Sequence, residues 1–179
     1  MRRPARVTAA LGAVAALGLA APAATASDAP DDTLRIHSSA FGGCLTAEGS
    51  GYRDPRGADR PWLVALQPCG AAPAARQLWI YSSATHQFSS VAEPYRCIDK
   101  QGSLFVTALC DADTPEQRFR TAPTGRAGER KIVSQSGGRI WEQVSHRSGG
   151  ARDAVGEGVR EARDAGAAPA DRRWKIGPA

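Results

Sequence analysis

Residues that could act as catalytic or metal-binding groups are few in this sequence and lie far apart along it. The three histidines, His37, His86 and His146, show neither metal-ligand spacing nor an H-E-x-x-H pattern. Ser38 and Ser145 each lie beside a histidine, but neighbouring residues of a strand point to opposite faces of the sheet. A serine–histidine pair for nucleophilic catalysis is therefore not expected. The sequence predicts a protein that is not an enzyme and that needs no cofactor and no metal.

The first 26 residues have the layout of a cleavable secretory signal. Arg2, Arg3 and Arg6 form a basic start, an uncharged run extends over 7–21, and Ala24-Thr25-Ala26 supplies an A-x-A cleavage motif. The apolar run is shorter than the roughly 20 residues that a bilayer-spanning helix needs. We expect cleavage after Ala26 and secretion of residues 27–179, with no membrane span after cleavage.

The charge of the expected mature chain argues against a nucleic-acid partner. The full sequence of 179 residues carries 23 basic and 18 acidic side chains, a net charge of +5. Three of the arginines lie in the expected signal, so the mature chain has 20 basic against 18 acidic side chains, a net charge of +2. No dense basic stripe remains, and a nucleic-acid interface would need one.

A different chemistry is offered by the four cysteines, Cys44, Cys69, Cys97 and Cys110. None of them forms the C-x-x-C pairs of a zinc site, and an even number in a secreted chain favours two disulfides. Four cysteines allow three pairings, and their order alone does not select one. The nearby pair Asp111 and Asp113 is typical of turn chemistry rather than of a cation site.

An internal repeat in the sequence indicates how the chain is organised. Three segments close on a large aromatic residue, in Gln77-Leu78-Trp79-Ile80, Gln117-Arg118-Phe119-Arg120 and Arg172-Arg173-Trp174-Lys175. Upstream of them lie Gly42-Gly43-Cys44-Leu45-Thr46, Tyr95-Arg96-Cys97-Ile98-Asp99 and Gly137-Gly138-Arg139-Ile140-Trp141. These matches divide the chain into repeats at roughly 32–83, 84–123 and 124–178.

Short β-strands are indicated within each repeat. The expected strands are rich in β-branched and aromatic residues and are bounded by turn residues, at 33–38, 62–67, 78–82, 87–91, 104–109 and 130–135. One unit of about four strands cannot bury its own apolar face, so an all-β, closed, threefold barrel is predicted. Its interior should be closed by Trp79, Phe119 and Trp174, and Trp62 is also expected in the core.

A cysteine-apolar-Asp strand, a second cysteine and a Q-x-W-like closure, repeated three times, resemble the ricin B-type lectins, a β-trefoil family. The resemblance covers essentially the whole expected mature chain. It implies a β-trefoil fold and a non-catalytic, carbohydrate-binding module. It also implies disulfides within repeats, Cys44–Cys69 and Cys97–Cys110.

In that family each sugar pocket combines an aspartate after the first cysteine, an aromatic ring and a polar residue before the second cysteine, and an asparagine before the closing motif. The first repeat has Thr46, Gln67, Ala65 and Arg76 at these places. The second has Asp99, Ala108, Val106 and Glu116, and the third has Trp141, Ala162, Arg160 and Asp171. Only Asp99 matches, so none of the three pockets is expected to be an intact galactose-type site.

Two residues keep alternative interpretations. Asp99 could hold ligand hydroxyls, or it could bond Gln117 of the closing motif as part of the scaffold. If Ile140 points inward, strand alternation turns Trp141 outward, where it could stack on a sugar or pack beneath the following loop. The candidate ligand-binding set is therefore Asp99, Glu116, Gln117 and Trp141.

The third repeat lacks both cysteines and is expected to be the least stable part of the fold. Arg139 falls at the first cysteine position, and Asp164, or Arg163 if the gap shifts, falls at the second. An Arg139–Asp164 ion pair could therefore replace the bridge. The segment 155–165 is expected to be a short charged helix or a mobile loop.

Two functions remain open from the sequence. The first is binding of an extracellular glycan or polysaccharide. The alternative is a trefoil that has lost sugar binding and recognises a protein partner through the long loops at 48–61 and 145–157, since such loops on a rigid scaffold carry function.

Overall fold

The computed structural model describes residues 33–48, 62–102, 104–144, 158–164, 166 and 168–179. The first repeat contains β1 (Thr33–Ser38), β2 (Cys44–Glu48), β3 (Leu63–Gln67), the short 3₁₀ helix η1 (Ala74–Gln77) and β4 (Trp79–Ser82). The second contains β5 (Gln87–Ser90), β6 (Arg96–Gln101), β7 (Leu104–Leu109), η2 (Pro115–Gln117) and β8 (Phe119–Pro123). The third contains β9 (Glu129–Ser134), β10 (Ile140–Val144), β11 (Gly158–Ala162), η3 (Ala170–Arg172) and β12 (Trp174–Pro178).

The outer strands of the three repeats join into a barrel. Antiparallel pairing links β12 to β1, β1 to β4, β4 to β5, β8 to β9 and β9 to β12. The ring is completed next to β5, where the Phe119 N–H donates to the carbonyl of His86 at 2.7 Å. The ring has far less unpaired strand edge than an open sheet of the same strands would expose.

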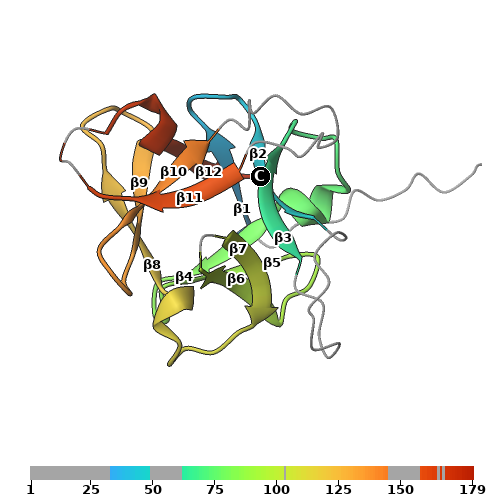
Figure 1. The fold of residues 1–179 in the computed structure, drawn as a ribbon. Coiled ribbons are helices and arrows are strands. Elements are labelled where there is room, and N and C mark those ends of the chain that lie inside the picture. The colour runs from blue at the N-terminus through green and yellow to red at the C-terminus, as the bar shows by residue number, and fades with distance from the viewer. Residues whose placement is uncertain (1–32, 49–61, 103, 145–157, 165, 167) are drawn as a thin grey trace, which may run out of the picture.

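The inner strands of each repeat form a hairpin beside the barrel: β2 with β3, β6 with β7 and β10 with β11. Figure 1 shows these three units arranged around one centre, with the first in blue to green, the second in green to yellow and the third in orange to red. This is a β-trefoil, the architecture that the repeats predict. The predicted repeat boundaries fall between β4 and β5 and between β8 and β9.

Large aromatic side chains from all three repeats fill the centre. The fully buried ones are Trp79, Phe88, Phe105, Phe119, Trp141 and Trp174, and they belong to one hydrophobic cluster. The three aromatic residues of the closing motifs are thus all internal, as the pattern predicts. Trp62 is half-buried and packs against the same cluster.

Two disulfides fix the hairpins of the first two repeats. Cys44 is bonded to Cys69 and Cys97 to Cys110, which matches the pairing within repeats that the family resemblance implies. The two bonded cysteines are 25 residues apart in the first disulfide and 13 residues apart in the second. Each is expected to stabilise the fold by about 3 kcal/mol in the chain-entropy model.

One local expectation is wrong, and others lie outside the described residues. Instead of a charged helix or a loop over 155–165, residues Gly158–Ala162 form β11, which pairs along its whole length with β10. The hydrogen bonds to β10 hold the backbone of these residues in an extended conformation. The expected signal at 1–26 and the loops at 49–61 and 145–157 lie outside the described residues. In the described part of the chain, no helix has the length and hydrophobicity needed to cross a membrane.

Candidate functional site

The closing glutamines of the first two repeats make equivalent sets of hydrogen bonds. Gln117 donates to the Asp99 carboxylate at 2.9 Å and to the Leu109 carbonyl at 2.8 Å, and its own carbonyl accepts from the Asp111 N–H. Gln77 donates in the same way to the Thr46 hydroxyl. Its other bonds, to the Pro68 carbonyl and from the Gly70 N–H, repeat the pattern. Each closing turn is therefore fastened to its hairpin by one buried side-chain amide.

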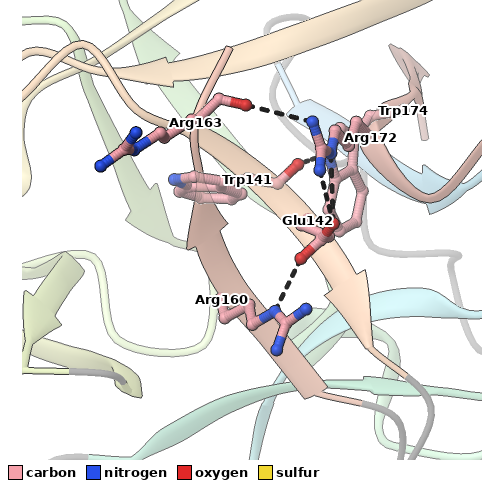
Figure 2. A network of polar contacts seen from close by, with 6 residues as sticks. All are labelled: Trp141, Glu142, Arg160, Arg163, Arg172 and Trp174. Atoms are coloured by element: carbon pink, nitrogen blue, oxygen red, sulfur yellow. Dashed lines mark hydrogen bonds and ion pairs between the residues drawn. The ribbon is translucent and has the colours of Figure 1, made fainter. Parts of the chain in front are cut away.

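In the third repeat an arginine takes the place of the glutamine. Figure 2 shows the guanidinium of Arg172 between the Glu142 carboxylate and the Arg163 carbonyl. Its Nε and Nη2 donate to one carboxylate oxygen at 3.1 and 3.0 Å, and Arg160 donates to the other oxygen at 2.6 Å. Glu142 is the acid equivalent to Asp99.

This network determines the ionisation of Glu142. Burial alone would raise the pKa of its carboxyl group, but the hydrogen bonds and charges of Arg160 and Arg172 outweigh burial and hold the pKa below its ordinary value. The carboxylate is charged and already occupied by two guanidinium groups. A sugar pocket would need a carboxylate that is free to accept from the ligand. In the third repeat the equivalent carboxylate, that of Glu142, is instead bonded to two arginines.

The expected alignment of the third repeat is wrong by one residue. Trp141 pairs across the hairpin with Glu161, and Glu142 pairs with Arg160, as Leu45 and Thr46 pair with Leu66 and Ala65 in the first repeat. Trp141 is thus equivalent to Leu45, whose carbonyl accepts from Trp79, just as the Trp141 carbonyl accepts from Trp174 at 3.3 Å.

An outward-facing Trp141 is accordingly excluded. Its side chain is 0% exposed, and its ring lies 4.7 Å from Phe105 and 4.9 Å from Phe119 between ring centroids. Ile140, the preceding residue, is also fully buried. Simple alternation fails because one face of β10 meets the core and the other is covered by neighbouring elements, so Trp141 cannot act as a stacking platform.

The expected ion pair between Arg139 and Asp164 is also corrected. Asp164 accepts from the Lys131 ammonium at 2.8 and 2.9 Å, while Arg139 is exposed. The hydrogen bond from Lys131 is the main reason why the pKa of Asp164 lies below its ordinary value. Ile140, rather than Arg139, stands at the position of the first cysteine.

The structure brings Asp99 and Gln117 together, but they are hydrogen-bonded to each other and do not both point into a pocket. Both are buried, and their mutual hydrogen bond is the scaffold interpretation of Asp99. Glu116, the third candidate, is half-buried at the start of the closing turn in η2. The structure places these three residues around one closing turn, far along the chain from the fourth candidate, Trp141.

The first repeat contains an open hollow that the sequence did not indicate. We call it the repeat-1 hollow; it has a volume of about 290 Å³ and is lined by Thr46, Ala47, Glu48, Gln67, Ala71, Ala72, Pro73 and Arg76. It lies between the β2–β3 hairpin and the turn that leads into η1. Three of its lining residues are the ones aligned above with the family's pocket positions, and none of those three is an aspartate or an aromatic ring.

The repeat-1 hollow is lined by one negatively charged side chain, Glu48, and one positively charged side chain, Arg76. Glu48 lies two residues after Thr46 on β2 and so shares its face of the strand; its carboxylate accepts from the side-chain amide of Gln67. Arg76 rests on the indole of Trp62, with its guanidinium carbon 4.8 Å from the ring centroid. This cation–π contact holds the guanidinium without using its in-plane N–H donors. Glu48 was missed because the family pattern looks for an acid at position 46.

His37 comes close to both sulfurs of the first disulfide. Its Nδ1 lies 3.5 Å from Cys44 Sγ and 3.4 Å from Cys69 Sγ. In the described part of the chain these three residues form the one cluster of potential metal ligands. Because the two sulfurs are bonded to each other, they offer no thiolate to a metal ion.

No protein-family model matches the chain, and no curated protein sequence matches it. Solved structures do. The designed threefold-symmetric protein ThreeFoil matches with a TM-score of 0.63 at 14% identity, covering 83% of this chain and 100% of ThreeFoil.

Two natural proteins match at a similar level. The C-half of the earthworm R-type lectin, solved in complex with GalNAc, has a TM-score of 0.59 at 16% identity and covers 81% of this chain and 97% of its own. A chain of the Haemophilus ducreyi cytolethal distending toxin has a TM-score of 0.62 at 17% identity, covering 84% and 86%. Together with the repeated hairpins and closing turns, these likenesses identify the fold: this chain is a β-trefoil, the fold that it shares with these structures.

Proposed function

We propose that the chain is a secreted, non-catalytic module that binds extracellular carbohydrate through the repeat-1 hollow. The observation that carries the proposal is an open hollow at the closing turn of the first repeat that is lined by an acidic and a basic side chain, Glu48 and Arg76. Secretion rests on the N-terminal signal pattern, and the two disulfides support an oxidising compartment.

The lining of the repeat-1 hollow suits a small polyhydroxylated ligand. The Glu48 carboxylate can accept hydrogen bonds from adjacent hydroxyl groups, and the Arg76 guanidinium can donate to hydroxyl oxygens in a fixed plane. Ala71, Ala72 and Pro73 give an apolar wall against which the C–H face of a pyranose can pack. Because no aromatic ring stacks on the sugar here, we expect weak binding of a single monosaccharide and tighter binding of a longer glycan.

Two further observations support this function. A lectin of the same fold was solved with GalNAc bound. The described histidines have structural contacts: His86 Nδ1 lies 3.1 Å from the Tyr81 hydroxyl, and His37 lies against the disulfide. Within the described residues, neither ring is hydrogen-bonded to a serine hydroxyl or a free thiol, as the ring of a catalytic base would be.

The test is glycan-array binding together with pull-down on insoluble polysaccharides. Wild type is compared with Glu48→Gln and Arg76→Gln, and Glu116→Gln in the second repeat is the matched control. Loss of one charged hydrogen bond should weaken binding about ten- to a hundredfold in the first two variants. The control should bind as wild type does. If Glu116→Gln loses binding while Glu48→Gln keeps it, the site lies in the second repeat instead.

Recognition of a protein partner is a second candidate, and one observation favours it. Tyr95 is 59% exposed and Leu109 is 58% exposed. Their backbones are neighbours at the open end of the β6–β7 hairpin, since the Cys110 N–H donates to the Tyr95 carbonyl at 2.9 Å. Exposed aromatic side chains such as that of Tyr95 are enriched at protein contact sites. Failure of the folded wild type to bind any glycan or polysaccharide would favour this function over carbohydrate binding.

A further inference from the structure

Three basic side chains share one face of the β1–β12 ladder. His37 on β1 is directly opposite Lys175 on β12, and Arg35 is opposite Gly177. Since side chains two residues apart in a strand point to the same face, Arg35, His37 and Lys175 all lie on that face.

A hollow of about 300 Å³ opens at this place. We call it the basic hollow; His37, Lys175, Ile176 and Gly177 line it from the ladder, and Ala127 and Gly128 line it from the turn before β9. The two glycines leave it open, because a Cβ built on either would meet no atom within 4 Å. The hollow thus has space for a small group beside His37 and Lys175, while Arg35 is not one of its lining residues.

No carboxylate in the described residues neutralises these cations. Arg35 and Lys175 form no ion pair there, and the Nε of Arg35 is buried without a hydrogen-bond partner. Glu129 on β9 is opposite Lys175 on the other side of β12, but its carboxylate is engaged by Arg173 at 2.7 Å. The charge facing the basic hollow is therefore positive.

The ionisation of His37 responds to the same surroundings. Burial, followed by the charges of Arg35 and Lys175, holds the pKa of His37 below its ordinary value. An anion in the basic hollow would oppose the effect of these charges, so the His37 ring reports on its occupancy.

We propose that the basic hollow binds a tetrahedral oxyanion, a sulfate or phosphate group, held by Lys175 and His37, which both line it. The exposed Lys175 ammonium can donate hydrogen bonds to the oxygens of such a group, and the protonated His37 ring can add a second charged donor. Arg35, on the same face of the ladder, adds positive charge without lining the hollow. The group can be a free anion or a substituent of an extracellular polymer. This site shares no residue with the repeat-1 hollow, so either proposal can fail without the other.

The experiment is an NMR titration of the full secreted chain with inorganic sulfate and, separately, inorganic phosphate, at constant ionic strength balanced with chloride. We expect saturable shifts at Gly128, Lys175 and Gly177 and a rise in the pKa of His37. Lys175→Gln should weaken binding about tenfold or more. Arg120→Gln, which removes an exposed positive charge outside the hollow, is the matched control and should bind as wild type does.

The absence of saturable shifts with either anion would overturn the proposal, as would wild-type affinity in Lys175→Gln. Competition with dextran sulfate, and with uncharged dextran as its control, identifies the source of the group. Displacement of sulfate by dextran sulfate alone indicates a polymer-borne group. Binding of free sulfate that dextran sulfate does not displace indicates a free anion.

Discussion

Arg172 bonds Glu142 in the third repeat as Gln117 bonds Asp99 in the second. Each side chain also reaches the carbonyl at the end of its hairpin, that of Arg163 or of Leu109. An arginine–glutamate pair thus fastens the closing turn where the other repeats use an amide. It does so in the repeat that lacks a disulfide.

Glu142→Gln is expected to destabilise the protein by about 2–3 kcal/mol, because it leaves Arg172, whose side chain is 20% exposed, without its charged acceptor. Arg160→Gln should cost less than about 1 kcal/mol, since that side chain is 59% exposed. Urea denaturation of both variants and wild type measures the difference. Equal losses in the two variants would contradict the assignment of the main contact to Arg172.

Acid should weaken the third repeat. The pKa values of Glu142 and Asp164 lie below their ordinary values in the folded state, so the unfolded chain takes up protons first as the pH falls. Their contribution is complete above the ordinary pKa of about 4.5 and is lost as the pH falls through the folded values. The melting temperature measured against pH should fall less steeply in this range for Glu142→Gln than for wild type. Parallel curves would contradict the prediction.

His37 should also make the protein less stable as the pH falls, but in a higher pH range. Its folded pKa is lowered from the ordinary 6.5, so the unfolded chain binds the proton more readily. Stability is therefore expected to decrease as the pH falls through about 6.5, and His37→Gln should remove this step. Melting temperatures of wild type and His37→Gln between neutral and mildly acidic pH give the comparison, and an identical step in the variant would show that another group is responsible.

The third repeat is still expected to open first. Ile140 and Asp164 stand where Cys97 and Cys110 link the second hairpin, and surface ion pairs contribute less than a disulfide. Hydrogen exchange should be faster for amides of β10 and β11 than for those of β6 and β7. Reduction of the disulfides should make the exchange rates of the two hairpins more alike, because the β6–β7 hairpin then loses its covalent link. Equal protection in the oxidised protein would count against this order.

Trp141→Ala should cost about 3–5 kcal/mol, as expected for loss of a fully buried large aromatic side chain. Because the ring lies among Phe105, Phe119 and Trp174, the loss is one of packing. Glycan binding by the fraction that remains folded should be unchanged. Loss of glycan binding without loss of stability would contradict the buried position.

The repeat pattern predicted the fold, the positions of Trp79, Phe119 and Trp174, and the disulfide pairing that the resemblance implies. It failed at Trp141, because the third repeat has no cysteine to fix its register. In all three hairpins the residue before the hydrogen-bonding side chain is large, apolar and buried: Leu45, Ile98 and Trp141. The need for a large buried residue just before the hydrogen-bonding side chain identifies Glu142 as the equivalent of Asp99. The presence of Arg172, which needs an acidic partner, supports the same alignment. The repeat-1 hollow could not be predicted, because it depends on how the turn at 71–73 packs beside β2.

An NMR titration of wild type with common neutral monosaccharides is the sharpest test of carbohydrate binding in the repeat-1 hollow, because it shows both whether a sugar binds and where. We expect saturable shifts for at least one sugar at Thr46, Glu48, Gln67 and Arg76. Absence of any saturable shift, or shifts confined to Asp99 and Glu116 in the second repeat, would contradict it.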